Sequence, residues 1–213
     1  MKRICLIAAL VGVSGLAQAI TVNAPSSLIG SGSLLGEDAY AWGVSISVPN
    51  GQTITSAQID FTSIDLAGAN SSGTGYLYTD LLKSTATPGG SVSTVSDNDN
   101  PGDYWATSGL TYTSVSSLFF PSVGTTISTN VVFNSTELAA LNSYLAAGSG
   151  TFDIGIDPDC HYNVGGLALV YSLSPTNHGN SVPDMATTSL LLVMGLAGLE
   201  IFRRQLVAVK IKA

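Results

Sequence analysis

The densest run of side chains able to do chemistry is Asp157-Pro158-Asp159-Cys160-His161-Tyr162-Asn163. Asp157, Asp159, His161 and Asn163 are spaced by two, which aims them at one point from a loop or places them on one face of a strand. Calcium prefers such carboxylate and carbonyl oxygens, whereas the imidazole favours a transition metal or a hydrogen-bonding role. The run predicts a metal or ligand site. The alternative is a turn whose acids cap backbone amides.

Two further acidic segments are candidate metal ligands. Glu37 and Asp38 precede the first strand with a clear alternation. In many jelly-roll binding modules, an N-terminal acid and an acid before the last strand share a structural calcium ion, so we expect Glu37 or Asp38 to meet Asp157 or Asp159. The segment 97–103 resembles the start of an EF-hand loop, but Pro101 and Ser108 replace two of its ligands. We interpret that segment as a solvated turn.

The aromatic side chains offer a second chemistry, stacking on sugar rings. Tyr104 and Trp105 follow the acidic segment 97–103 in an expected loop and are the better ligand candidates, whereas Trp42 lies on an alternating strand and is expected in the core. The sequence has no Gly-x-Ser-x-Gly, phosphate-binding or His-Glu-x-x-His motif. We therefore predict a protein that is not an enzyme. The alternative is a glycan-active enzyme that uses acids around Asp157 and Asp159.

The elements that must position these side chains read as an all-β domain over residues 20–174. Residues 42–48, 57–61, 152–156 and 167–173 alternate apolar and small or polar positions, which predicts half-buried strands separated by turns. One helix is expected between Asn134, with Glu137 as its capping-box partner, and Gly148. Short strands with one helix favour a β-sandwich or jelly roll.

Charge separates this domain from the ends of the chain. Residues 20–181 contain one basic and twelve acidic side chains, a formal charge of −11, and the other six basic residues flank the apolar end segments. A body this acidic excludes nucleic acid as a partner, because phosphate binding needs basic side chains. It suits a neutral ligand, a divalent cation or a soluble extracellular protein.

Residues 1–19 read as a secretory signal peptide. Lys2 and Arg3 precede a short apolar core, and residues 17–19 match the small-x-small cleavage pattern. Removal of this segment takes Cys5 with it and leaves Cys160 as the only cysteine, so no intramolecular disulfide is expected.

The other end combines a polar linker (175–181) with a tripartite tail (182–213). Val182-Pro183-Asp184 precedes an apolar run of residues 185–202, which is near the lower limit for a membrane-spanning helix, and Arg203-Arg204 follows. The basic pair predicts that the C-terminus stays in the cytoplasm. One interpretation of the whole tail is an ordinary C-terminal membrane anchor. The tail resembles the PEP-CTERM class of bacterial sorting signals, closest to its Val-Pro-Asp-Ser-Gly variant, although Met185-Ala186 stands in place of Ser-Gly.

That resemblance implies export by the general secretion machinery and processing by an exosortase, a membrane peptidase that releases its substrates to the cell surface or matrix. Residues 39–43, 77–82 and 152–163 are also similar to an uncharacterised β-rich domain of PEP-CTERM proteins. Together these resemblances imply an exported cell-surface or matrix protein, structural or associated with exopolysaccharide. We expect calcium as its one structural cofactor.

Overall fold

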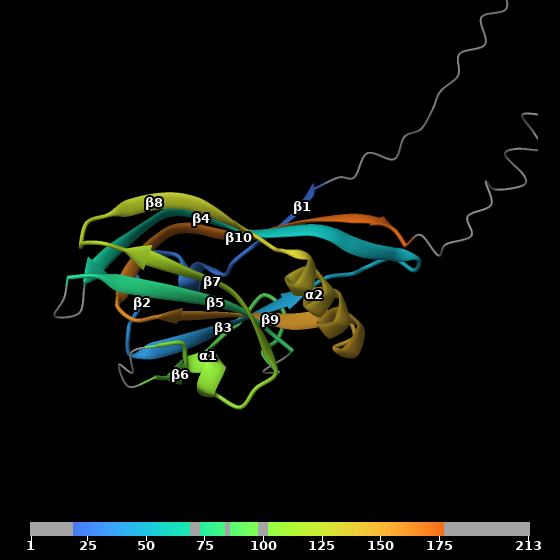
Figure 1. Cartoon of the computed structure of the whole chain (residues 1–213), viewed down its shortest axis with the longest axis horizontal. Helices are drawn as coiled ribbons and strands as arrows, with labels where there is room; N and C mark the ends of the chain where they lie inside the picture. The colour runs from blue at the N-terminus through green and yellow to red at the C-terminus, as the bar shows by residue number, and fades with distance from the viewer. Residues whose placement is uncertain (1–18, 69–72, 84–85, 98–101, 177–213) are drawn as a thin grey trace, which may run out of the picture. The chain divides into compact units, whose positions relative to one another are not determined.

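Two antiparallel β-sheets make up most of the described chain, as Figure 1 shows. This computed structural model describes residues 19–68, 73–83, 86–97 and 102–176. The first sheet contains β1 (Ala19–Asn23), β2 (Gly30–Leu34), β4 (Gln52–Gly68), β8 (Thr126–Val132) and β10 (His161–Pro175). The second contains β3 (Asp38–Ser45), β5 (Gly75–Leu82), β6 (Val92–Ser96), β7 (Tyr112–Phe120) and β9 (Thr151–Pro158). The predicted all-β fold is confirmed at this level.

The order of the strands places distant segments side by side. The first sheet runs β1-β10-β4-β8, with β2 also paired to β10, and a 3-10 turn, η1 (Ser26–Leu28), joins β1 to β2. The second sheet runs β6-β3-β9-β5-β7. Because β9 and β10 belong to different sheets, the chain changes sheets between Pro158 and His161.

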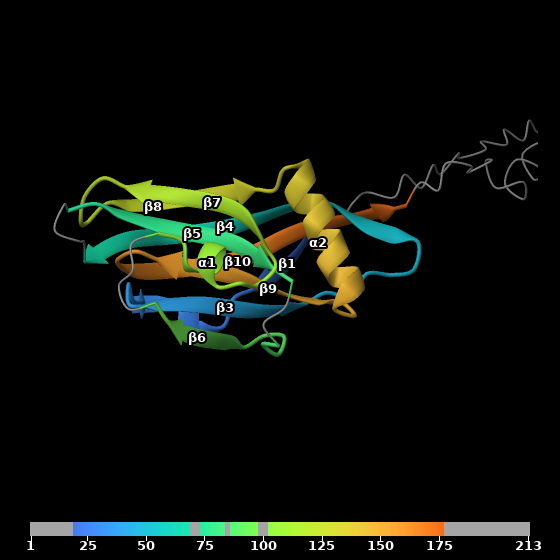
Figure 2. The ribbon, with the colours of Figure 1, turned by 60° about the horizontal axis from the view of Figure 1, so that its bottom comes forward.

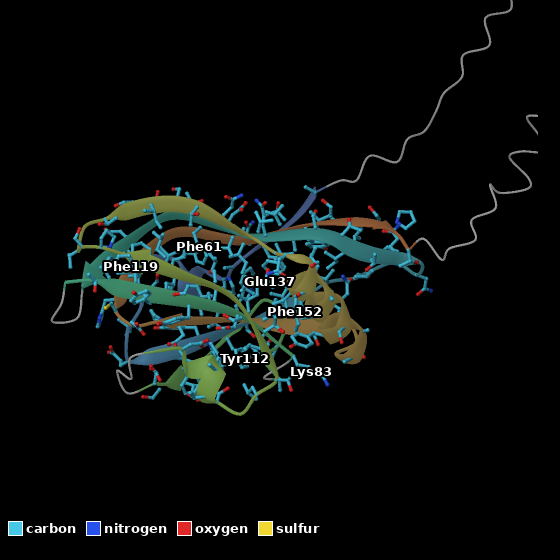
Figure 3. The ribbon with its side chains drawn as sticks, in the orientation of Figure 1. Phe61, Lys83, Tyr112, Phe119, Glu137 and Phe152 are labelled. Atoms are coloured by element: carbon cyan, nitrogen blue, oxygen red, sulfur yellow. The ribbon has the colours of Figure 1, made fainter. Side chains whose placement is uncertain are left out.

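The core lies between the two sheets. The inward-facing positions of β3, β4, β5, β9 and β10 are apolar and almost fully buried. Phe61 on β4 and Phe152 on β9 enter this layer from opposite sheets, as Figure 3 shows. Burial of this apolar surface is the main contribution that stabilises the domain, since the described residues contain no disulfide.

Helix α2 (Ser135–Ala147) crosses one end of the two sheets (Figure 2). The Asn134 side chain accepts hydrogen bonds from the backbone N–H groups of Thr136 and Glu137, and the Glu137 carboxylate accepts one from the Asn134 N–H at 2.6 Å. The capping box predicted from the sequence is therefore present. Leu141 and Leu145 bury the inner side of this helix against the core.

A second, short helix was not anticipated. Helix α1 (Tyr104–Thr107) lies outside the second sheet, on the face away from the core (Figure 1). Its Trp105 is buried in a separate small cluster with Ala39, Ala41 and Leu82. This cover explains why β3 is buried on both faces, although its alternating sequence predicts one exposed face.

The predicted targeting segments fall almost wholly outside the described residues. These are the signal peptide (1–19), of which only Ala19 is described, and the sorting motif Val182, Pro183, Asp184, Arg203 and Arg204. Strand β1 begins at Ala19, the residue before the predicted cleavage point. In the ranges described above, no helix combines the length and apolar character needed to cross a membrane.

Candidate functional site on the outer face of the second sheet

The outer face of the second sheet gathers side chains from three neighbouring strands. Strand β5 lies between β9 and β7, with Tyr78 opposite Asp157, Asp80 opposite Gly155 and Tyr76 opposite Phe119. Directly opposed residues of an antiparallel pair share one face. Since side chains alternate along β5, Tyr76, Tyr78 and Asp80 all project outward, away from the core.

An aromatic strip, formed by Tyr76, Tyr78 and Phe119, runs along this face. The ring centroids of Tyr76 and Phe119 are 5.0 Å apart, and those of Tyr76 and Tyr78 are 6.1 Å apart with an interplanar angle of only 18°. Phe119 is 52% exposed and Tyr76 is 39% exposed. Phe119 lies near one end of β7 and Tyr112 at the other, as Figure 3 shows.

An acidic cluster adjoins the aromatic strip. It consists of Asp80 on β5, Asp97 after β6, Asp103 before α1, and Asp157 and Asp159 at the end of β9. The charge of Asp103 acts on Asp80, Asp157 and Asp159, and Asp97 acts on Asp157. Three strands and one helix therefore bring together five carboxyl groups that lie far apart in the sequence.

Asp80 is the most unusual member of the acidic cluster. Its side chain is fully buried, although it lies on the outer face of the sheet. Neither of its carboxyl oxygens makes a hydrogen bond within normal geometric limits, although Asp103 and the Ser114 hydroxyl lie near enough to affect its pKa. Burial, reinforced by the charges of Asp103 and Asp157, raises the pKa of Asp80 to about 8.

Three of the other acids hold the N-terminal end of α1 through backbone amides. The Tyr104 N–H donates to Asp157 Oδ2 at 2.6 Å, and the Gly102 N–H donates to Asp159 Oδ1 at 3.1 Å. Asp103 accepts from the N–H groups of Trp105 and Ala106 as the N-cap of α1. Burial still raises the pKa of Asp157 to about 7, and Asp157 Oδ1 has no hydrogen-bond partner.

Glycine at position 155 allows α1 to lie flat on the sheet. A Cβ atom there would lie 2.8 Å from the Trp105 indole ring, closer than such contacts allow. Trp105 is 1% exposed, so the ring predicted to stack on a ligand belongs instead to the packing of α1. Tyr104, the other predicted ligand residue, is partly exposed and packs edge-on against Trp105 with ring centroids 5.0 Å apart.

The structure divides the predicted metal site between two places. Asp157 and Asp159 belong to the acidic cluster, whereas Glu37 Oε2 lies 3.4 Å from His161 Nε2. Asp38 lies opposite Ser96 in the pairing of β3 with β6. Among the described His, Cys, Asp and Glu side chains, no group of three stands in a position to hold a metal ion.

The two ligand candidates of β10 lie on the first sheet. Asn163 accepts a hydrogen bond from the Gly32 N–H at 2.6 Å and donates one to Asp65 at 3.1 Å, so it joins β2, β4 and β10. The spacing by two therefore does not bring His161 and Asn163 to Asp157, because the chain changes sheets between them.

Sequence reasoning missed Asp80, Asp103 and Phe119 as site residues. Asp80 carried a usable signal, since it is an acid within the otherwise uncharged strand of residues 75–82. The sequence has no comparable signal for which segments lie beside that strand, and it is this arrangement that brings Asp103 and Phe119 close to it. In the comparisons with known proteins, no protein-family model and no curated protein matches this chain.

Proposed function

We propose that this chain is an exported, non-enzymatic protein that binds exopolysaccharide at the cell surface or in the matrix through the aromatic strip. The observation that carries the proposal is the partly exposed row of Tyr76, Tyr78 and Phe119. Exposed apolar patches on soluble domains mark interaction sites, and aromatic rings combine a flat apolar face with polar edges. A polysaccharide presents both flat apolar ring faces and hydroxyl groups.

The acidic side chains beside the aromatic strip favour a neutral or amino-bearing glycan as its ligand. The charges of Asp159, Asp103 and Asp157 all act on the Tyr78 phenol and, after burial, help to raise its pKa. Lys83 is the only Lys or Arg side chain within the described ranges. It follows the last residue of β5, whereas Tyr76 lies near the first. In Figure 3, Lys83 and Phe119 are labelled at different ends of the second sheet. A polyanionic glycan would therefore be repelled from this face.

The binding experiment compares variants of the aromatic strip. The full-length chain, purified in mild detergent, is incubated with exopolysaccharide from the producing cell and with insoluble neutral glycans. Tyr76→Ala and Phe119→Ala should each weaken binding roughly five- to tenfold, because each removes about 1 kcal/mol of ring contact. Tyr112→Ala is the matched control, since Tyr112 is 36% exposed at the other end of β7. Equal binding by all three variants would rule out the aromatic strip as the binding site.

The proposal of export depends on the sequence of the two ends. The signal-peptide pattern of residues 1–19, the resemblance of residues 182–213 to PEP-CTERM tails, and the all-β fold support it together. Exosortase and the general secretion machinery are the expected partners, with a transient membrane anchor before processing. The intact mass of protein released from the producing cell tests this. Cleavage after Ala19 and near the Val182-Pro183-Asp184 motif is the expected result, and a full-length mass would contradict it.

An extracellular glycan-active enzyme remains the second candidate. The raised pKa of Asp157, about 7, favours it, because a general acid must hold its proton near neutral pH. Against it, Asp157 is 1% exposed and one of its oxygens already accepts from the Tyr104 N–H. Turnover on a glycan panel that disappears in both Asp157→Asn and Asp159→Asn would favour the enzyme. No turnover by the unmodified chain would favour the binding protein.

A further inference from the structure

Two carboxyl groups of the acidic cluster are buried with no basic side chain of the described residues beside them. Asp80 is fully buried and Asp157 is 1% exposed. Among the described residues, the basic side chains are Lys83 and His161. His161 Nε2 lies 3.4 Å from Glu37 Oε2, and the backbone N–H of Lys83 donates to the Thr111 carbonyl. Folded proteins pair buried carboxylates with cations or metals, because a buried charge alone is strongly unfavourable.

Hydrogen bonds from α1 satisfy only part of the acidic cluster. Backbone N–H groups of residues 102–106 donate to Asp103, to Asp159 and to one oxygen of Asp157. The second oxygen of Asp157 and both oxygens of Asp80 have no hydrogen-bond partner. Three buried oxygen atoms from neighbouring strands are therefore left for a ligand, and Asp103 faces Asp80 from α1.

We propose that a divalent cation, with calcium as the expected ion, binds among Asp80, Asp103 and Asp157. Three carboxylates without Cys or His are hard oxygen donors, which suit calcium and disfavour zinc or copper. The ligand set differs from the one expected from the sequence, since Asp80 and Asp103 replace Glu37 and Asp38. It is also independent of glycan binding by the aromatic strip.

Occupation of the site requires the three carboxyl groups to change their arrangement. As they stand, no three acidic, His or Cys side chains in the described ranges are placed to hold a metal ion. Asp80 and Asp157 lie on adjacent strands, whereas Asp103 is carried by the segment that leads into α1. Because Asp103 is also the N-cap of α1, binding of the ion is coupled to the docking of α1 and Trp105 on the sheet.

The test measures thermal stability of the full-length chain, first stripped with a chelator and then given about 1 mM calcium. Binding to the folded state alone raises Tm, and we expect a rise of several degrees. Sodium chloride at matched ionic strength is the control for screening of this acidic domain. An equal rise in Tm with sodium chloride, or no rise with calcium, would overturn the proposal.

Asp80→Asn is the decisive variant. Asparagine has nearly the same shape but no charge, so the stripped variant should be at least as stable as the stripped parent. It should lose the rise in Tm with calcium, and terbium luminescence excited through the neighbouring Trp105 should fall with it. Asp60→Asn, on β4 of the first sheet, is the matched control and should keep both signals. The same calcium response in Asp80→Asn and Asp60→Asn would exclude the site.

Discussion

Asp80 shows how one residue can define a site without being exposed. Its strand neighbours Leu81 and Leu82 are buried in apolar clusters, whereas Asp80 is buried near the carboxyl groups of Asp103 and Asp157. Burial of a carboxyl group favours its protonated form, and nearby carboxylates act in the same direction. The charge of this single side chain therefore links the protonation state of the domain to its stability.

The first prediction concerns pH, in the presence of a chelator. The pKa of Asp80 is about 8 in the folded state against an ordinary value of 3.8, so the folded state binds the proton more tightly than the unfolded state. Stability should therefore fall as pH rises from about 4 to about 8, by at most about 1.4 kcal/mol per pH unit from this group, and the effect should level off above pH 8.

Denaturant unfolding at several pH values between about 5 and 9 measures the effect. Because other acids of the domain also titrate, the quantity of interest is the difference between the parent and Asp80→Asn. The free energy of unfolding of Asp80→Asn, relative to that of the parent, should increase as pH rises. Parallel curves for the two proteins would show that Asp80 does not titrate in this range.

Individual residues could be recognised from the sequence only in part. Asp157 and Asp159 stood out because they are crowded into one short run, and the structure places both in the acidic cluster. His161 and Asn163 belong to the same run but lie on the first sheet. Spacing along a chain predicts a shared face only if the chain stays in one strand, and here it changes sheets after Pro158.

At the scale of elements, α2 is the part of the fold that local sequence determines most directly. Its N-terminal end is held by reciprocal bonds between Asn134 and Glu137, and its Gly148 N–H closes the last turn onto the Tyr144 carbonyl at 2.7 Å. Each of these contacts spans four residues or fewer. A pattern of this kind is visible in the sequence without knowledge of the tertiary structure.

The second prediction is that Asn134→Ala destabilises the domain by about 1 kcal/mol, because the N–H groups of Thr136 and Glu137 lose their acceptor. Asn134→Asp keeps a capping oxygen but places a second carboxylate beside Glu137. It should therefore recover only part of the loss. Denaturant melts of the three proteins measure this, and an unchanged midpoint in Asn134→Ala would contradict it.

Helix α1 could not be predicted because its one local signal, the Asp103 N-cap, is not what holds it on the sheet. Four residues are too few to form a helix alone, since nucleation is unfavourable. The helix is held by the packing of Trp105 on Gly155 and by the Tyr104 N–H on Asp157, both contacts across about fifty residues. Sequence alternation found segments of β3, β4, β9 and β10, but strand partners require the same long-range information.

At the scale of the whole described domain, charge and topology act together. The acids are distributed over both sheets, yet five of them converge where β5, β9 and the start of α1 meet. The aromatic strip begins beside them, so one face of the second sheet carries both proposed binding functions. The first sheet has no comparable group, and its Asp60 and Asp65 accept hydrogen bonds from neighbouring side chains.

The pairing of β1 with β10 also determines how the domain can be reconnected. Ala19 lies opposite Ser172, so the first and last strands meet at one end of the first sheet. A short flexible linker from Pro175 back to Ala19 would close the backbone into a ring. The ring can then be opened at the exposed turn Asn50-Gly51, which the hydrogen bond from the Gln52 N–H to the Pro49 carbonyl spans.

Such a circular permutant should keep the same two sheets, with a Tm within a few degrees of the parent, because it alters no core contact. Circular dichroism and thermal melts are sufficient to measure this. Loss of the cooperative melt would show that the order of the strands along the chain, and not only the set of contacts, matters to folding. A permutant that folds could carry a fused partner at Gly51, with no chain leaving from the paired ends of β1 and β10.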